Sequence, residues 1–215
     1  YKLIYINIIP YISIMNLFDK SKTENKVLRF GDFSTDRPFT YFCDMDGVLT
    51  AFEQRFLDIS GGLLPDEYDT KHGKFSFWQL IETKGLTWWS DMPWIEGGKE
   101  IWNFINSNND AMICSSPSRS PLSSKGKMIW IERELGIKQE SSTRSPKNTK
   151  WSPDSRIILG SQKYLFNKRY PNSILIDDTP KQINNWRNNG GLAVLHEGNA
   201  ADTIAQLKEM TSKLV

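Results

Sequence analysis

The chain has 215 residues, of which 39% are hydrophobic and 24% charged, and its 27 basic against 25 acidic residues give a formal net charge of +2. This length supports one domain with its own hydrophobic core, and the ordinary composition excludes collagen-like, coiled-coil and wholly disordered chains. A net charge this small argues against a dedicated nucleic-acid-binding or membrane-binding protein.

Residues 1–15 form an apolar and aromatic stretch, which is followed by a polar stretch at 16–26. The apolar stretch is too short to span a bilayer, and it lacks the basic start and the cleavage site of a secretory signal. We expect residues 1–36 to be an N-terminal extension of a cytoplasmic protein. Translation would start at Met15, with the residues before it as an upstream extension or an accessory strand.

Five short apolar runs predict the strands of a parallel sheet. They lack polar alternation, which is typical of strands covered on both faces, and they lie at 39–43, 111–114, 156–159, 173–176 and 192–195. Patterns of helical periodicity lie between or after them, at 97–107, 124–135, 180–188 and 200–214. The alternation predicts an α/β fold, with a Rossmann-like parallel sheet core and helices on both faces. Cys43 and Cys114 lie in two of these runs, which predicts buried free thiols.

Residues 52–96 interrupt this alternation. The segment is rich in Phe, Trp and Gly and holds one predicted helix, at 53–60, so it indicates an insertion after the first strand. Several of the eight tryptophans of the chain should line a core or a pocket for a planar ligand.

Carboxylates follow two of the predicted strands directly. Asp44 and Asp46 come after the first strand, with Gly47 next, and Asp177 and Asp178 end another strand. The carboxyl ends of parallel strands meet at one edge of a sheet, where ligands bind. Four carboxylates at one edge would repel one another unless a cation lay among them, and an all-oxygen set favours Mg²⁺.

These residues resemble motifs of the haloacid dehalogenase superfamily of phosphohydrolases, and in particular those of its 5'(3')-deoxyribonucleotidase branch. The resemblance covers roughly residues 39–196. It rests on DMDGVLTAFEQRFL at 44–57, ICSSP at 113–117, GKMIWIERELG at 126–136 and ILIDDTP at 174–180. It implies a small, mainly helical cap at 52–96, inserted into a core made of residues 37–51 and 97–215.

The resemblance also implies roles for the acidic residues. Asp44 would be the nucleophile that takes the phosphoryl group, and Asp46 would act as general acid and then as general base. Mg²⁺ would be held by Asp44, by Asp46 through its backbone carbonyl, and by Asp177 or Asp178. The implied activity is hydrolysis of a (deoxy)nucleoside monophosphate through an aspartyl-phosphate intermediate.

The same motifs include hydroxyl and ammonium groups that are candidates for binding the phosphate. Ser115 matches the family's phosphate-binding Ser or Thr, and Ser116 is the alternative. Lys127 matches the family's phosphate lysine best, and Lys163 competes for the same role. Thr179 stands where mammalian relatives often have Arg, which puts phosphate contacts or sugar preference there in doubt.

Four aromatic residues of the insertion are candidates for stacking on a nucleobase: Phe52, Trp78, Trp88 and Trp89. The alternative is that they form the hydrophobic core of the cap itself. For the whole protein, the alternatives are a phosphatase or phosphomutase acting on another small phosphorylated metabolite, and a non-enzymatic nucleotide-binding module. The expected partner is a small phosphorylated substrate without stable nucleic-acid or membrane contacts, and the sequence is compatible with a homodimer.

Overall fold

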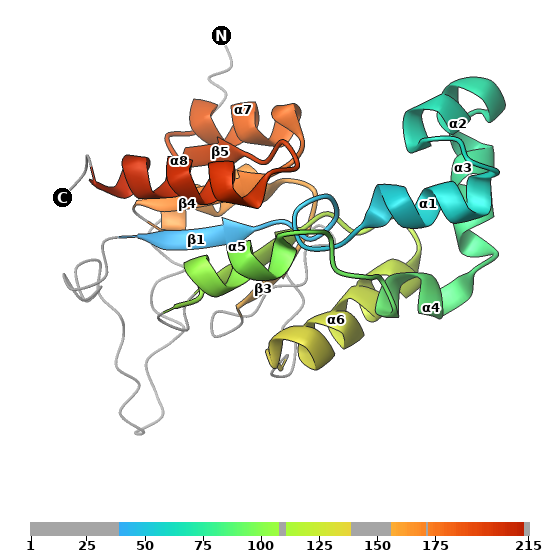
Figure 1. The fold of residues 1–215 in the computed structure, drawn as a ribbon, viewed down its shortest axis with the longest axis horizontal. Coiled ribbons are helices and arrows are strands. Elements are labelled where there is room, and N and C mark those ends of the chain that lie inside the picture. The colour runs from blue at the N-terminus through green and yellow to red at the C-terminus, as the bar shows by residue number, and fades with distance from the viewer. Residues whose placement is uncertain (1–38, 108–110, 139–155, 171, 213–215) are drawn as a thin grey trace, which may run out of the picture. The chain divides into compact units, whose positions relative to one another are not determined.

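Five parallel strands form the centre of the structure, a computed structural model (Figure 1). It describes residues 39–107, 111–138, 156–170 and 172–212, all within the unit Arg37–Val215. The strands follow the order β3-β2-β1-β4-β5 across the sheet. Their bounds are Thr40–Cys43 for β1, Met112–Ser115 for β2, Ile157–Leu159 for β3, Ser173–Asp177 for β4 and Leu192–Leu195 for β5. All five predicted strands are therefore present, and the predicted α/β class with a parallel sheet is confirmed.

Both faces of the sheet are covered, as the unbroken apolar runs predict. Successive side chains of a strand point to opposite faces, so neighbours such as Phe42 and Cys43 belong to different hydrophobic clusters. Cys43 shares its cluster with residues of α5 (Gly98–Ile105), α6 (Pro121–Leu135) and α8 (Ala200–Ser212). Phe42 shares the other cluster with Trp186 of α7 (Pro180–Asn188), whose ring centroid lies 5.1 Å from its own.

Helix α6 begins earlier than its hydrophobic periodicity predicts. The expected start was residue 124, whereas the helix begins at Pro121. Ser120 caps it by accepting a hydrogen bond from the Leu122 N–H at 3.3 Å, and proline is favoured at the first helical position. The added turn brings the start of α6 close behind the end of β2.

The inserted segment contains four helices, three more than the sequence predicted. They are α1 (Phe52–Ser60), α2 (Pro65–His72), α3 (Lys74–Glu82) and α4 (Gly85–Ser90), and β1 points toward them in Figure 1. Their shared core is aromatic, with the rings of Phe56 and Phe77 centred 4.7 Å apart. We refer to these four helices as the cap.

Cap helix α4 packs directly on core helix α6, and the two lie side by side in Figure 1. A Cβ placed on Gly126 of α6 would lie 2.3 Å from the Trp89 Cβ and 2.9 Å from the Ser90 nitrogen, so this contact depends on glycine. Nearby, the Trp130 indole donates a hydrogen bond to the Met92 carbonyl at 2.7 Å. The same helix therefore anchors the cap and, one residue after Gly126, carries Lys127.

Within the described residues, no helix is both long enough and apolar enough to cross a membrane. Cys43 and Cys114 are free and buried, as predicted. The expectations for residues 1–36 lie outside the described residues.

Candidate active site

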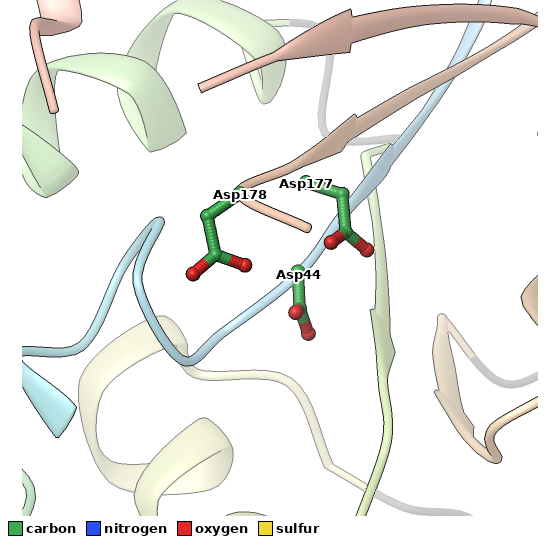
Figure 2. Close-up of side chains that lie close together, drawn as sticks. All are labelled: Asp44, Asp177 and Asp178. Atoms are coloured by element: carbon green, nitrogen blue, oxygen red, sulfur yellow. The ribbon is translucent and has the colours of Figure 1, made fainter. Parts of the chain in front are cut away.

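Three carboxyl groups meet at the carboxyl edge of the sheet. Asp44 follows β1 directly, Asp177 ends β4 and Asp178 follows it, and one oxygen of each lies within 4.8 Å of the others (Figure 2). The parallel pairing of Cys43 with Ile176 explains the meeting, because it aligns the ends of the two strands. The Asp44 N–H extends this pairing by donating to the Ile176 carbonyl at 2.9 Å.

The turn after β1 leaves room for the third carboxylate at Gly47. Its φ is +78°, a left-handed conformation that glycine adopts without strain. A Cβ at this position would lie 2.0 Å from Asp178 Oδ2, so any side chain would displace that carboxylate. Glycine is thus required by the acidic group as well as by the turn.

Lys163 lies buried against two of the three carboxylates. Its Nζ is 2.9 Å from Asp44 Oδ1 and 2.6 Å from Asp177 Oδ2, and its side chain is 1% exposed. Burial alone would lower the pKa of this lysine, but the Asp44 and Asp177 carboxylates outweigh that effect and raise it. Lys163 therefore stays charged and cancels one of the three negative charges.

Asp46 is not part of this cluster and contacts a second buried lysine. Its Oδ2 lies 2.6 Å from Lys127 Nζ, and its Oδ1 accepts a hydrogen bond from the Thr50 hydroxyl at 3.1 Å. Lys127 Nζ also donates to Ser115 Oγ at 3.2 Å. An acid, a hydroxyl and an ammonium group thus lie next to the three-carboxylate cluster.

From the sequence, Lys127 and Lys163 were alternatives for the phosphate-binding lysine. In the structure both lie in the site, with different partners. Ser116 lies one residue beyond Ser115, and its hydroxyl donates only a long hydrogen bond, 3.4 Å, to the Gly160 carbonyl. Thr50 was not singled out from the sequence. Its place four residues after Asp46 was the available signal, because a tight turn brings such residues together.

Burial and mutual repulsion shift the titration of the acidic cluster. The pKa of Asp177 is raised to about 6, by burial first and then by the Asp44 charge. The pKa of Asp178 is raised to about 7 by desolvation and by the charges of Asp44 and Asp177, although its side chain reaches solvent. The ionised carboxylates therefore repel one another in the site, and a bound cation would reduce this repulsion.

The donor set fits a hard divalent cation. When all three are ionised, the carboxylates and the Lys163 ammonium together carry a net charge of −2, and all the ligand atoms are oxygens. Each carboxylate offers an oxygen within 4.8 Å of the other two, so all three could turn toward one small ion that prefers oxygen ligands. Asp44, Asp177 and Asp178 are the side chains that could hold such an ion.

The four aromatic residues expected to bind a base differ in position. Trp88 and Trp89 are 1% and 3% exposed, which leaves their rings little surface for a ligand. Phe52 packs against both, with ring centroids 5.9 and 6.2 Å away. Trp78 is half-buried and lines a cavity of about 800 Å³ between α3 and the loop that follows β2.

That cavity, here called the α3 cavity, has lining residues that were not predicted from the sequence. Phe75 is 75% exposed and precedes Trp78 by three positions, a spacing that puts both on one face of α3. The opposite wall is formed by residues 117–121. Helical spacing could have placed Phe75 and Trp78 on one face of α3, but it could not have shown that this face lines a cavity.

No protein-family model matches the sequence, and no curated protein matches it. Solved structures do match. One, described as a haloacid dehalogenase-like hydrolase from Burkholderia xenovorans LB400, has 12% identity and a TM-score of 0.42, over 82% of this chain and 91% of its own. Another, described as a hydrolase from Streptococcus pneumoniae TIGR4, has 14% identity and a TM-score of 0.44, over 80% of this chain and 97% of its own. At these identities the likeness concerns the arrangement of strands and helices and says nothing about chemistry.

Proposed function

We propose that this chain is a phosphomonoesterase of the haloacid dehalogenase type that hydrolyses a nucleoside monophosphate through a phosphorylated Asp44. The observation that carries the proposal is the meeting of Asp44 with Asp177, Asp178 and buried Lys163 at one edge of the sheet. Asp46, Lys127 and Ser115 lie beside them and supply a proton-transfer group and two phosphate ligands.

In the first step an Asp44 carboxylate oxygen attacks phosphorus, and the bond from phosphorus to the ester oxygen breaks. Asp46, in its protonated form, gives its proton to the departing oxygen, so the alcohol leaves neutral. Lys127 is shared between Asp46 and Ser115 in the free protein. A phosphoryl oxygen at Ser115 would compete for this ammonium group and free Asp46 for proton transfer.

In the second step water attacks the phosphorylated Asp44 and gives a proton to the Asp46 carboxylate. The bond between phosphorus and the Asp44 oxygen breaks, inorganic phosphate leaves, and both carboxyl groups return to their starting states. Splitting the hydrolysis in this way lets one residue serve as acid and then as base.

Positive charge is needed because an anionic nucleophile must approach an anionic phosphate. Lys163 supplies one such charge at Asp44, and Lys127 supplies another at Ser115. A Mg²⁺ ion held by Asp44, Asp177 or Asp178 and the backbone carbonyl of Asp46 would lower the remaining repulsion.

The nucleoside part of the proposed substrate finds support in the aromatic wall of the α3 cavity. Its volume of about 800 Å³ lies within the range of small-molecule pockets, roughly 300–1,000 Å³. Ring faces such as those of Phe75 and Trp78 bind any planar base by stacking, without reading its edge.

Phosphate release tests the proposal directly. The purified protein is incubated with nucleoside 5'- and 3'-monophosphates, sugar phosphates and p-nitrophenyl phosphate, with Mg²⁺ or with EDTA. We expect release from the nucleotides with Mg²⁺ and loss of release in EDTA. Absence of phosphate release from every ester, in folded protein with Mg²⁺, would overturn the proposed function.

A further inference from the structure

The α3 cavity carries more positive charge than a nucleoside alone requires. Lys74 on the cap side and Arg119 on the loop side both line it, and both are exposed. Neither forms an ion pair with another residue that the structure describes. The acid in the lining, Glu82, accepts a hydrogen bond from the Ser120 hydroxyl at 2.9 Å.

These two cations are separate from the groups that would hold the scissile phosphate. Lys127 and Lys163 already contact Asp46, Ser115, Asp44 and Asp177. The cavity wall starts at Pro117, two residues after Ser115, and two residues of extended chain span about 7 Å. A ligand whose phosphate lies at Ser115 can therefore reach the cavity with its remaining part.

The apolar part of the lining indicates what that part is. Phe75 leaves three quarters of its surface exposed, and Trp78 is its neighbour on the same helix face. Prolines at 117 and 121 add apolar surface to the opposite wall. One exposed ring and one half-buried ring beside two cations that lack an ion-pair partner among the described residues favour a planar group that carries its own negative charge.

We propose that the preferred substrate is an aromatic phosphate ester with a second anionic group, bound in the α3 cavity by Phe75, Trp78, Lys74 and Arg119. This inference rests on the proposed function, because it places the scissile phosphate at Ser115. The second anion is a phosphate or a carboxylate, and it lies outside the catalytic groups. Its binding would lower KM more than it changes kcat, because it contacts the part of the substrate that does not react.

Two matched pairs of esters test the substrate class. Thymidine 5'-monophosphate is compared with thymidine 3',5'-bisphosphate, and phenyl phosphate with 4-carboxyphenyl phosphate, with products separated by chromatography. We expect the second anion to raise kcat/KM about tenfold in at least one pair, the effect of one charge-assisted hydrogen bond. A ratio of one or below in both pairs would overturn the inference.

Charge variants locate the effect. Lys74→Gln and Arg119→Gln should lower the ratio toward one, whereas Glu82→Gln should raise it because the opposing charge is removed. Lys84→Gln is the matched control, a cap lysine outside the cavity lining, and it should keep the wild-type ratio. If the kcat/KM ratio falls equally in all three lysine and arginine variants, the effect is a long-range charge effect, which would contradict a specific anion site in the cavity.

A binding measurement separates this inference from the proposed function. Calorimetry with thymidine 3',5'-bisphosphate and Asp44→Asn protein does not depend on turnover. Suppose that binding weakens in Arg119→Gln but not in Lys84→Gln, and that the wild type does not hydrolyse the compound. This result would support the proposed anion site in the α3 cavity and would overturn the proposed phosphatase activity. Phosphate release from all four esters with no second-anion preference would do the opposite.

Discussion

The sheet and the cap bury their residues in different ways. In the sheet, the strands are covered on both faces, and the acidic groups lie at the carboxyl edge, where Asp44 and Asp177 are found. In the cap, four short helices pack through aromatic side chains such as Phe56 and Trp88, which are continuous with the core on one face of the sheet, while Phe75 on α3 stays exposed. Under the proposed function, phosphoryl chemistry would depend on the edge of the sheet, and recognition of the leaving group would depend on the cap.

Because of this division, we expect variants of the sheet edge to impair catalysis and variants of the cap to impair substrate binding. The proposed nucleophile, Asp44, and the carboxylates beside it lie at strand ends that are aligned by backbone pairing. The α3 cavity has one wall from the cap and one from the core, so it depends on how α4 is seated on α6. Variants of the edge, of the cap core and of the junction can test each part in turn.

The largest effect is expected at the sheet edge. Asp44→Asn should lower kcat at least about a thousandfold, because an amide is a poor nucleophile and a poor cation ligand. Circular dichroism should show the fold retained, since the amide has the same shape as the carboxylate. Rates are measured as steady-state phosphate release.

Asp58→Asn serves as the control for this change. Asp58 is exposed on α1 of the cap, and its removal should leave turnover within about twofold. Substantial phosphatase activity in pure Asp44→Asn protein would sink the nucleophile assignment.

Two cap tryptophans should separate packing from binding. Trp88 is 1% exposed, so Trp88→Ala should destabilise the protein by about 3–5 kcal/mol and impair all substrates together. Trp78→Ala should instead raise KM for a nucleotide roughly 5- to 150-fold, the effect of losing one stacked base. Its effect on p-nitrophenyl phosphate should be smaller, because a smaller ring makes less use of the cavity.

Chemical denaturation and KM for both substrates are measured for each variant. Equal losses on the two substrates for Trp78→Ala, with a lowered melting temperature, would mean that Trp78 belongs to the packing of the cap. The edge of the sheet would keep its assignment in that case.

The junction between the two regions is tested at Gly126. Gly126→Ala should destabilise the protein by about 1–3 kcal/mol, because its Cβ would overlap Trp89 and the backbone of Ser90. In an unpacked helix the same change would stabilise by about 1 kcal/mol. The sign of the change in unfolding free energy therefore decides whether α4 is seated on α6, with Lys125→Ala as the exposed neighbour for comparison.

The sheet could be predicted from sequence because its signal is local. Each strand is built on a short apolar run, which in β1 ends directly at Asp44, and burial on both faces removes any polar alternation. Of the three cap helices that were missed, α3 has nine residues, as many as the predicted α1, so length does not explain its omission, whereas α2 and α4 give little sequence signal. Helix α2 buries none of its residues, and α4 has only six, so neither shows a periodic apolar face.

The acidic residues of the site were identified by their position at strand ends. The pairing of Lys163 with Asp44 and Asp177, and of Lys127 with Asp46, could not be predicted, because it depends on how buried chains fill space between elements. The depth of Trp88 and Trp89 was hidden for the same reason. An aromatic residue in a helix gives no sequence signal that separates a core position from a pocket wall.

The smallest effect concerns protons competing with a metal at the sheet edge. In the metal-free protein the pKa of Asp177 is raised to about 6 and that of Asp178 to about 7, while both ionise near 3.8 in the unfolded chain. Between these values the folded state binds more protons, so its stability falls as pH rises through 6 to 7. Mg²⁺ should reverse this loss, because it favours the ionised carboxylates.

We expect Mg²⁺ to bind at least about tenfold more weakly at pH 5.5 than at pH 8, because it must displace protons at the lower pH. The rise in melting temperature with Mg²⁺, measured against an EDTA sample at each pH, checks this. Asp178→Asn should reduce both the rise and its pH dependence, whereas Asp58→Asn should leave them unchanged. An equal rise in melting temperature at both pH values would mean that the ion does not bind among these carboxylates. Their negative charge would then be balanced by Lys163 alone.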